Sequence, residues 1–140
     1  MKLLTQTQYS TLLDNGRKQA LVKGTVDEID FYPVVKLFYP AGAATWLLTE
    51  LDPDDEDIAW GLCDLGMGEA EYGAVSLSEL RGLKSALGLG IERDRTWTAR
   101  APVSAYIDAA LKAGRIVDVP RAEPELIASC AASGSENSQQ

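Results

Sequence analysis

Carboxylates are the side chains of this sequence with the clearest potential for chemistry, and they gather in its middle. Between Lys36 and Arg81 the chain has ten acidic residues and no Lys or Arg. We call this stretch the acidic segment. Its carboxylates are those of Glu50, Asp52, Asp54, Asp55, Glu56, Asp57, Asp64, Glu69, Glu71 and Glu79. The other 11 acidic and 13 basic residues nearly balance, so the net charge of −8 belongs to this segment. A region of one sign attracts partners of the other sign.

Several kinds of chemistry could use these carboxylates. Two of them could divide acid and base roles in a hydrolase, although among ten acids a suitable pair has little specificity. A Ca²⁺ loop read from Asp52 would need Gly at its sixth position and Glu at its twelfth, where the chain has Asp57 and Cys63. A row of carboxylates could also imitate duplex DNA, which presents one charge per about 1.7 Å. The simplest alternative is a solvated acidic surface that favours solubility.

The absence of histidine narrows the enzyme classes open to this chain. Serine–histidine and cysteine–histidine pairs and the usual zinc sites are excluded. The two cysteines, Cys63 and Cys130, form no Cys-x-x-Cys motif, and Cys63 is expected to pack as a small hydrophobe. We therefore expect no catalytic residue, no metal site and no cofactor, and the balance leans away from an enzyme.

Glycines and tryptophans give weaker signals. The glycine pairs at 66/68 and 88/90 complete no phosphate-binding motif, and Gly88 suits the end of a helix. Trp46 and Trp60 lie in apolar stretches and are expected in the core. Trp97 stands near three arginines, a combination that could contact nucleic acid. Pairing of this patch with the acidic segment, in the same molecule or in a partner copy, is the favoured interpretation. The three arginines are Arg93, Arg95 and Arg100.

Length and composition indicate one soluble globular domain. The chain has 140 residues, of which 46% are hydrophobic and 24% charged. No apolar run approaches the roughly 18 residues that span a bilayer. The opening residues 1–4 are followed by polar residues 5–8, so no signal-peptide core forms. We expect a cytoplasmic protein with no membrane partner.

Local patterns place the elements that must position the acidic segment. Capping boxes at Thr5–Gln8 and Ser76–Glu79 open two helices, and Pro102 opens a third. Alternating and β-branched stretches predict strands, and Asp52-Pro53 predicts a turn between two of them. The expected helices cover 5–23, 77–87 and 102–113, the expected strands 34–39, 44–51 and 58–64, and an edge strand 91–98.

These elements predict a single α+β domain in which about three helices pack on a short antiparallel sheet of roughly three to five strands. Residues 1–117 would form the domain, and 118–140, rich in Ser, Gly and Gln at its end, a partly disordered tail. The expected core includes Leu12, Leu37, Trp46, Leu48, Trp60, Leu62, Leu80, Leu83, Ile107 and Leu111.

Several linked motifs resemble one known family, filed as domain of unknown function 2958. The likeness runs from the first helix to Trp97. The motifs are Val35-Lys36-Leu37-Phe38, Ala44-Thr45-Trp46-Leu47-Leu48-Thr49-Glu50-Leu51-Asp52, Gly61-Leu62-Cys63-Asp64-Leu65-Gly66, Tyr72-Gly73-Ala74-Val75-Ser76-Leu77-Ser78-Glu79-Leu80 and Gly88-Leu89-Gly90-Ile91-Glu92-Arg93-Asp94. The family has no agreed activity. The resemblance implies a setting, bacterial plasmids and integrative conjugative elements, where acidic proteins sometimes imitate DNA.

The leading hypothesis is a non-enzymatic accessory protein of a mobile element whose acidic face engages a basic, nucleic-acid-handling or host-defence protein. No direct binding to nucleic acid is expected. The residues expected on that face are Glu50, Asp52, Asp54, Asp55, Glu56, Asp57, Asp64, Glu69 and Glu71. Two alternatives stay open. One is a carboxylate- or metal-dependent enzyme. The other is a structural subunit without a ligand that self-associates through an apolar patch, which could contain Tyr32, Phe38 or Tyr39. The oligomeric state is left open.

Overall fold

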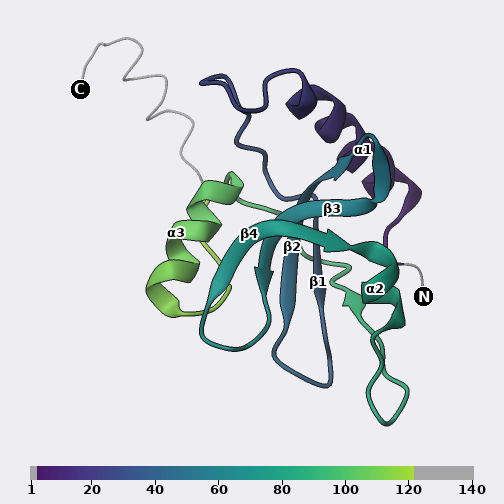
Figure 1. Ribbon diagram of the computed structural model, residues 1–140. Helices are drawn as coiled ribbons and strands as arrows, with labels where there is room; N and C mark the ends of the chain where they lie inside the picture. Colours follow the sequence, from purple (N-terminus) through teal and green to yellow (C-terminus); the bar gives the residue numbers. More distant parts are fainter. Residues whose placement is uncertain (1–2, 122–140) are drawn as a thin grey trace.

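A five-stranded antiparallel sheet and three helices make up the fold in the computed structural model, which describes residues 3–121 (Figure 1). The strands lie in the order β4-β3-β2-β1-β5. Their bounds are Val35–Phe38 for β1, Thr45–Asp52 for β2, Asp55–Asp64 for β3, Ala70–Ser76 for β4 and Glu92–Arg93 for β5. The expected α+β class is confirmed, with consecutive strands paired as neighbours from β1 to β4.

The turn between β2 and β3 forms where the sequence predicts it. Asp52 pairs with Asp55, which leaves Pro53 and Asp54 as a two-residue connection. Oδ1 of Asp52 accepts a hydrogen bond from the backbone N–H of Asp54 at 2.9 Å. The proline ring fixes φ at the first turn position, and the carboxylate satisfies a backbone donor. The acidic residues at this tip are therefore held on a short, well-determined hairpin.

The two outer strands differ from expectation. β4 was not among the expected strands, because Glu71 and Gly73 interrupt its apolar pattern, yet it pairs with β3 along its whole length. The edge strand expected over 91–98 is real but short, and only Glu92 and Arg93 pair with β1. It stops because Oδ1 of Asp94 accepts hydrogen bonds from Thr96, and this turn leads the chain away from the sheet.

Helix α1, Gln6–Ala20, starts at the predicted capping box. The hydroxyl of Thr5 accepts from the N–H of Gln8, and the Gln8 side chain accepts from the N–H of Thr5, both at 3.0 Å. The helix ends three residues before the expected 23. Gly16 does not interrupt it. A Cβ at Gly16 would lie 1.7 Å from the carbonyl oxygen of Leu51, so glycine lets α1 approach β2 closely.

Helix α2, Leu77–Gly82, is shorter than the expected 77–87. Leu83 leaves the helical conformation, and Lys84 forms a bridge with Gly90, which closes a small loop. Gly88 therefore lies in that loop, at φ +79°, and is not a helix end. Leu83, expected in the core, is 46% exposed as a result.

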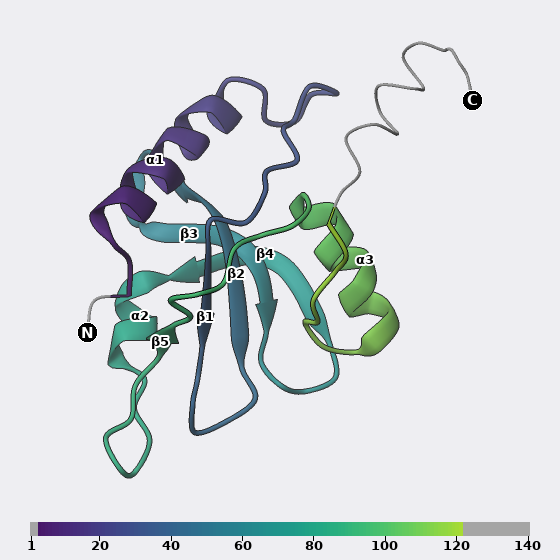
Figure 2. The ribbon, with the colours of Figure 1, turned by 180° about the vertical axis from the view of Figure 1, so that it is seen from behind.

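Helix α3, Val103–Ala113, packs on the opposite side of the sheet from α1 and α2 (Figures 1 and 2). The two sides have separate cores because neighbouring residues of a strand point to opposite faces. Trp46 and Leu48 of β2 join the core under α1 and α2, whereas Leu47 joins the core under α3.

Most of the expected core is confirmed, with a few exceptions. Leu111 is 70% exposed because it lies on the outer side of α3, beyond the buried Tyr106 and Ala110. Trp60 and Ile107 are only half-buried. The expected core residues that are buried are Leu12, Leu37, Trp46, Leu48, Leu62 and Leu80.

The packed part of the chain reaches at least to Val119, which is buried in the core under α3. The expected tail 118–140 lies mainly outside the described residues, together with Cys130. Within residues 3–121, no helix is long and apolar enough to cross a membrane.

Candidate functional site

The acidic segment is divided between the two ends of β3. The turn after β2 and the first residues of β3 form one end, which we call the acidic hairpin end. Ten residues of strand span about 30 Å. The far end, where β3 turns into β4, has the remaining acids. The acidic hairpin end comprises Asp52, Asp54, Asp55, Glu56 and Asp57, with Glu79 nearby in α2; the far end has Asp64, Glu69 and Glu71.

Exposure separates the expected binding residues further. Asp54, Asp55 and Glu56 are exposed at the acidic hairpin end, and Glu69 and Glu71 at the far end. Asp52 and Asp57 are half-buried. Glu50 and Asp64 are buried, with only 4% and 2% of their surface exposed, so neither belongs to an exposed acidic face. The structure thus brings together three exposed carboxylates that are consecutive in sequence, and not a single face of nine.

The arginine patch lies away from the acidic hairpin end. Arg93 is on β5, at the sheet edge opposite β4. Trp97 packs against Tyr106 in the core under α3, with ring centroids 5.8 Å apart, and is not a free stacking surface. Arg93 apart, no Lys or Arg in residues 3–121 makes an ion pair with the acidic segment, and Lys18 pairs instead with Asp14 in α1.

Asp57 has a structural task as the cap of α2. Its carboxylate accepts hydrogen bonds from the hydroxyls of Ser76 and Ser78, at 2.7 and 2.9 Å, and from the N–H of Ser78 at 2.9 Å. These donors favour the ionised form and hold the pKa of Asp57 below its usual range. Ser76 in turn accepts from the N–H of Glu79. The first turn of α2 is therefore attached to β3.

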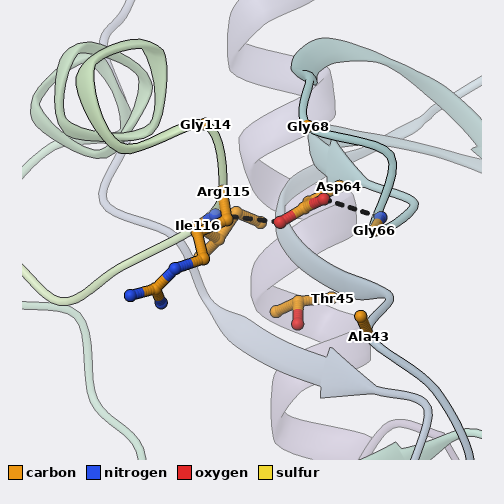
Figure 3. A pocket seen from close by; sticks show the side chains of 8 residues that line it. All are labelled: Ala43, Thr45, Asp64, Gly66, Gly68, Gly114, Arg115 and Ile116. Atoms are coloured by element: carbon orange, nitrogen blue, oxygen red, sulfur yellow. Dashed lines mark hydrogen bonds between the residues drawn. The ribbon is translucent and has the colours of Figure 1, made fainter.

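Asp64 has a comparable structural role beside a cavity of about 450 Å³ (Figure 3). One oxygen accepts from the N–H of Gly66 at 2.8 Å and the other from the N–H of Ile116 at 2.9 Å. Both oxygens thus bind backbone donors, and they join the β3–β4 turn to the residues after α3. Arg115 extends away from Asp64 in Figure 3. Because both Asp64 oxygens already accept backbone hydrogen bonds, this carboxylate offers little further hydrogen bonding to a ligand in the cavity.

Glu50 has a different environment, because β2 bulges there. Leu48 pairs with Gly61 and Glu50 with Trp60, so Thr49 is the extra residue. Burial is the largest influence on Glu50 and raises its pKa, while Lys23, Gln19 and Tyr72 oppose the shift.

Hydroxyl groups complete the surroundings of Glu50. The Tyr72 hydroxyl donates to Glu50 Oε1 at 3.4 Å and lies 2.9 Å from the Thr49 hydroxyl. Burial also raises the pKa of Tyr72 to about 12, so its proton is retained. The outcome is a buried carboxylate that faces a tyrosine donor.

A cavity of about 260 Å³ opens beside Glu50, between α1 and the acidic hairpin end. We call it the Trp60 cavity. Trp60 stacks near Tyr72, with ring centroids 6.4 Å apart, and the ammonium of Lys23 lies 4.0 Å from the Trp60 ring centroid. The residues that line it are Gly16, Ala20, Lys23, Glu50, Asp52, Pro53, Asp54 and Trp60.

Sequence reasoning placed Trp60 in the core and did not single out Lys23 or Tyr72. One local signal was present. Thr49 and Glu50 are polar residues inside an otherwise apolar strand, and such residues often mark a site. The contact between Lys23 and Trp60 joins positions far apart in the chain, so no local sequence pattern predicts it.

Neither a metal centre nor a reactive thiol is evident among the described residues. Within residues 3–121, no group of three or more Cys, Asp or Glu side chains is placed to hold a metal ion. Cys63 is half-buried, and burial raises its pKa to about 11, as suits a packed thiol.

The fold and these sites define a small α+β domain with an acidic hairpin. A family profile described as a protein of unknown function, DUF2958, matches residues 3–117. The chain therefore belongs to this family, as its motifs suggested. Comparison with curated proteins and with solved structures finds no match.

Proposed function

We propose that this protein is a non-enzymatic interaction module that binds a basic protein through the acidic hairpin end. The observation that carries the proposal is the row of exposed carboxylates at Asp54, Asp55 and Glu56, on a turn fixed by Pro53. A preformed turn presents its charges with little loss of conformational freedom on binding. No salt bridge within residues 3–121 engages these three carboxylates, so a partner's Lys and Arg would meet them unpaired.

The class of partner follows from the charge and from the family resemblance. A basic surface is most developed on proteins that handle nucleic acid, because they neutralise phosphates. We propose a cytoplasmic accessory role on a plasmid or integrative element, with a nucleic-acid-handling or host-defence protein as the partner. Three adjacent carboxylates would compete with phosphates for its cationic groove. The far end, with Glu69 and Glu71, would add steering and not contact.

Affinity capture from the bacterial host tests the proposal. The tagged full chain should retain a basic protein that elutes as salt rises, because charge attraction is screened over about 8 Å at physiological ionic strength. The triple variant Asp54→Asn/Asp55→Asn/Glu56→Gln should weaken that binding by about tenfold, if each of the three exposed pairs contributes about 0.5 kcal/mol.

A matched control separates the hairpin from net charge. The variant Glu69→Gln/Glu71→Gln/Asp108→Asn removes the same three charges from exposed positions elsewhere. It should change the affinity less than twofold. An acidic partner, binding that ignores salt, or equal losses in both variants would contradict the proposal.

One observation favours a second candidate, a carboxylate-dependent enzyme. Glu50 combines a raised pKa with a cavity and a tyrosine donor, as general acids do. It lacks a second buried carboxylate in the same cavity, since Asp52 is half-buried and Asp54 exposed. Loss of a measured turnover in Glu50→Gln, with partner binding retained, would favour this candidate over the interaction module.

A further inference from the structure

The Trp60 cavity has walls suited to a positive charge. One wall is the face of Trp60, and an aromatic face attracts cations through its quadrupole. Another is formed by the carboxylates of Glu50, Asp52 and Asp54, of which Glu50 is buried. Lys23 is the one basic residue among the lining residues. Against three carboxylates it leaves the lining with an excess of negative charge.

Lys23 lines this cavity and lies over its aromatic wall. Its ammonium lies 4.0 Å from the Trp60 ring centroid, and Lys23 shares the lining of the cavity with Glu50. Its residue is nevertheless exposed, just after the end of α1. A rotation of the side chain would therefore free the ring without a change in the backbone.

The backbone around Lys23 is fixed, which supports a role for the side chain alone. The Gln19 amide accepts from the N–H of Ile29 at 2.8 Å and donates to its carbonyl at 2.9 Å. Glu28 accepts from the N–H of Gly24 at 2.8 Å. These bonds hold the segment that follows α1 beside the cavity, with Lys23 at its start.

We infer that the Trp60 cavity receives a Lys or Arg side chain of a basic protein partner, and that Lys23 occupies it until the partner displaces it. This inference rests on the proposed function and specifies where a side chain of the partner would bind. The cavity adjoins the acidic hairpin end through Asp52, Pro53 and Asp54, so one partner would reach both. At about 260 Å³ it is smaller than pockets for drug-sized ligands, about 300 Å³ or more, and suits a single side chain.

Competition from Lys23 has a measurable consequence. A ligand that binds only the open cavity has an apparent affinity reduced by the fraction of open molecules. Removal of Lys23 should therefore tighten binding of a lysine side chain. The gain should be about two- to fivefold, the weight of one exposed cation–π contact.

The experiment titrates ¹⁵N-labelled full chain with Nα-acetyl-lysine methylamide and follows the Trp60 indole and Gly16 amide signals. Lys23→Ala should bind this probe two- to fivefold more tightly than the unaltered protein. Lys18→Ala, which removes the same charge from exposed α1, should bind as the unaltered protein does. Nα-acetyl-norleucine methylamide, which has a similar side chain without the charge, should give no shift.

Two further variants test the walls. Glu50→Gln should weaken binding of the lysine probe to Lys23→Ala, and Trp60→Leu should abolish the shift at Gly16. Retained dispersion of the remaining signals checks that each variant is folded. Should Trp60→Leu unfold, the comparison of Lys23→Ala with Lys18→Ala still decides the matter, because both positions are exposed.

Failure of this inference is separable from failure of the proposed function. Absence of any probe-induced shift in Lys23→Ala, or equal shifts with the norleucine probe, would overturn the inference even where the triple hairpin variant weakens partner binding. Binding of the lysine probe without capture of any basic protein would support the cavity and count against the proposed function.

Discussion

At the scale of single residues, close backbone approach determines how the site is built. Gly16 lets α1 rest against the carbonyl of Leu51, and that contact brings α1 to the acidic hairpin end. The floor of the Trp60 cavity is thus formed by small residues of α1, Gly16 and Ala20. A larger side chain at Gly16 would separate the two elements that enclose the cavity.

Gly16→Ala should destabilise the protein by about 1 to 3 kcal/mol, the usual penalty for overpacking. The added Cβ would meet a backbone oxygen at 1.7 Å, which cannot rotate away. Urea unfolding measures the change. Gly82→Ala, in helix α2, is the control because nothing lies within 4 Å of its Cβ, and there the better helix propensity of Ala should be neutral or slightly stabilising. Equal midpoints for the two variants would contradict the close approach.

At the scale of elements, α2 depends on a residue outside itself. Ser76 caps the helix as the sequence predicts, but Asp57 of β3 accepts hydrogen bonds from the Ser76 and Ser78 hydroxyls and from the Ser78 N–H. A six-residue helix is too short to be stable alone, so this attachment to β3 sets its place.

Asp57→Ala should lower the urea midpoint at pH 7, and the difference should shrink in acid. Hydrogen bonds hold the folded pKa of Asp57 below its unfolded value of about 3.9. Its contribution to stability is therefore present above that value and is lost as the pH falls through the folded pKa. Unfolding at pH 7, 4 and 2.5 measures this. Glu56→Ala, at an exposed neighbour, should change the midpoint little at any of these pH values.

The helices and strands also show how much of the fold could be predicted from the sequence. Helix starts were predictable, because Thr5 and Ser76 cap through bonds to residues three positions away. The end of α2 was not, because it depends on the Lys84–Gly90 bridge, which competes with further helix. β4 was not predicted, because an edge strand that contains Glu71 and Gly73 lacks the apolar pattern of an inner strand.

At the scale of the whole molecule, two cores divided by one sheet hold the chain together. The core under α3 includes Val119, beyond the boundary expected at 117 and beyond the family match. The candidate site, too, was only partly predictable from the sequence. The exposed acids could be read from composition, but the burial of Glu50 and Asp64 and the contact of Lys23 with Trp60 arise only when distant segments pack.

A chain that ends after Val117 should be less stable than one that ends after Arg121 by about 1.5 to 3 kcal/mol, the value of one buried valine. The reason is the place of Val119 in the core under α3. Urea unfolding of these two chains measures the difference. Equal stability of the two shortened chains would show that Val119 adds nothing to that core.

The two-residue turn at Pro53 has a consequence for kinetics. Charges on a narrow, rigid tip act at a distance before any surface meets, so they mainly govern how often productive encounters occur. For the proposed partner, charge neutralisation at this tip would slow association far more than it would hasten release. The lifetime of the complex would be set elsewhere, by whatever becomes desolvated behind the tip.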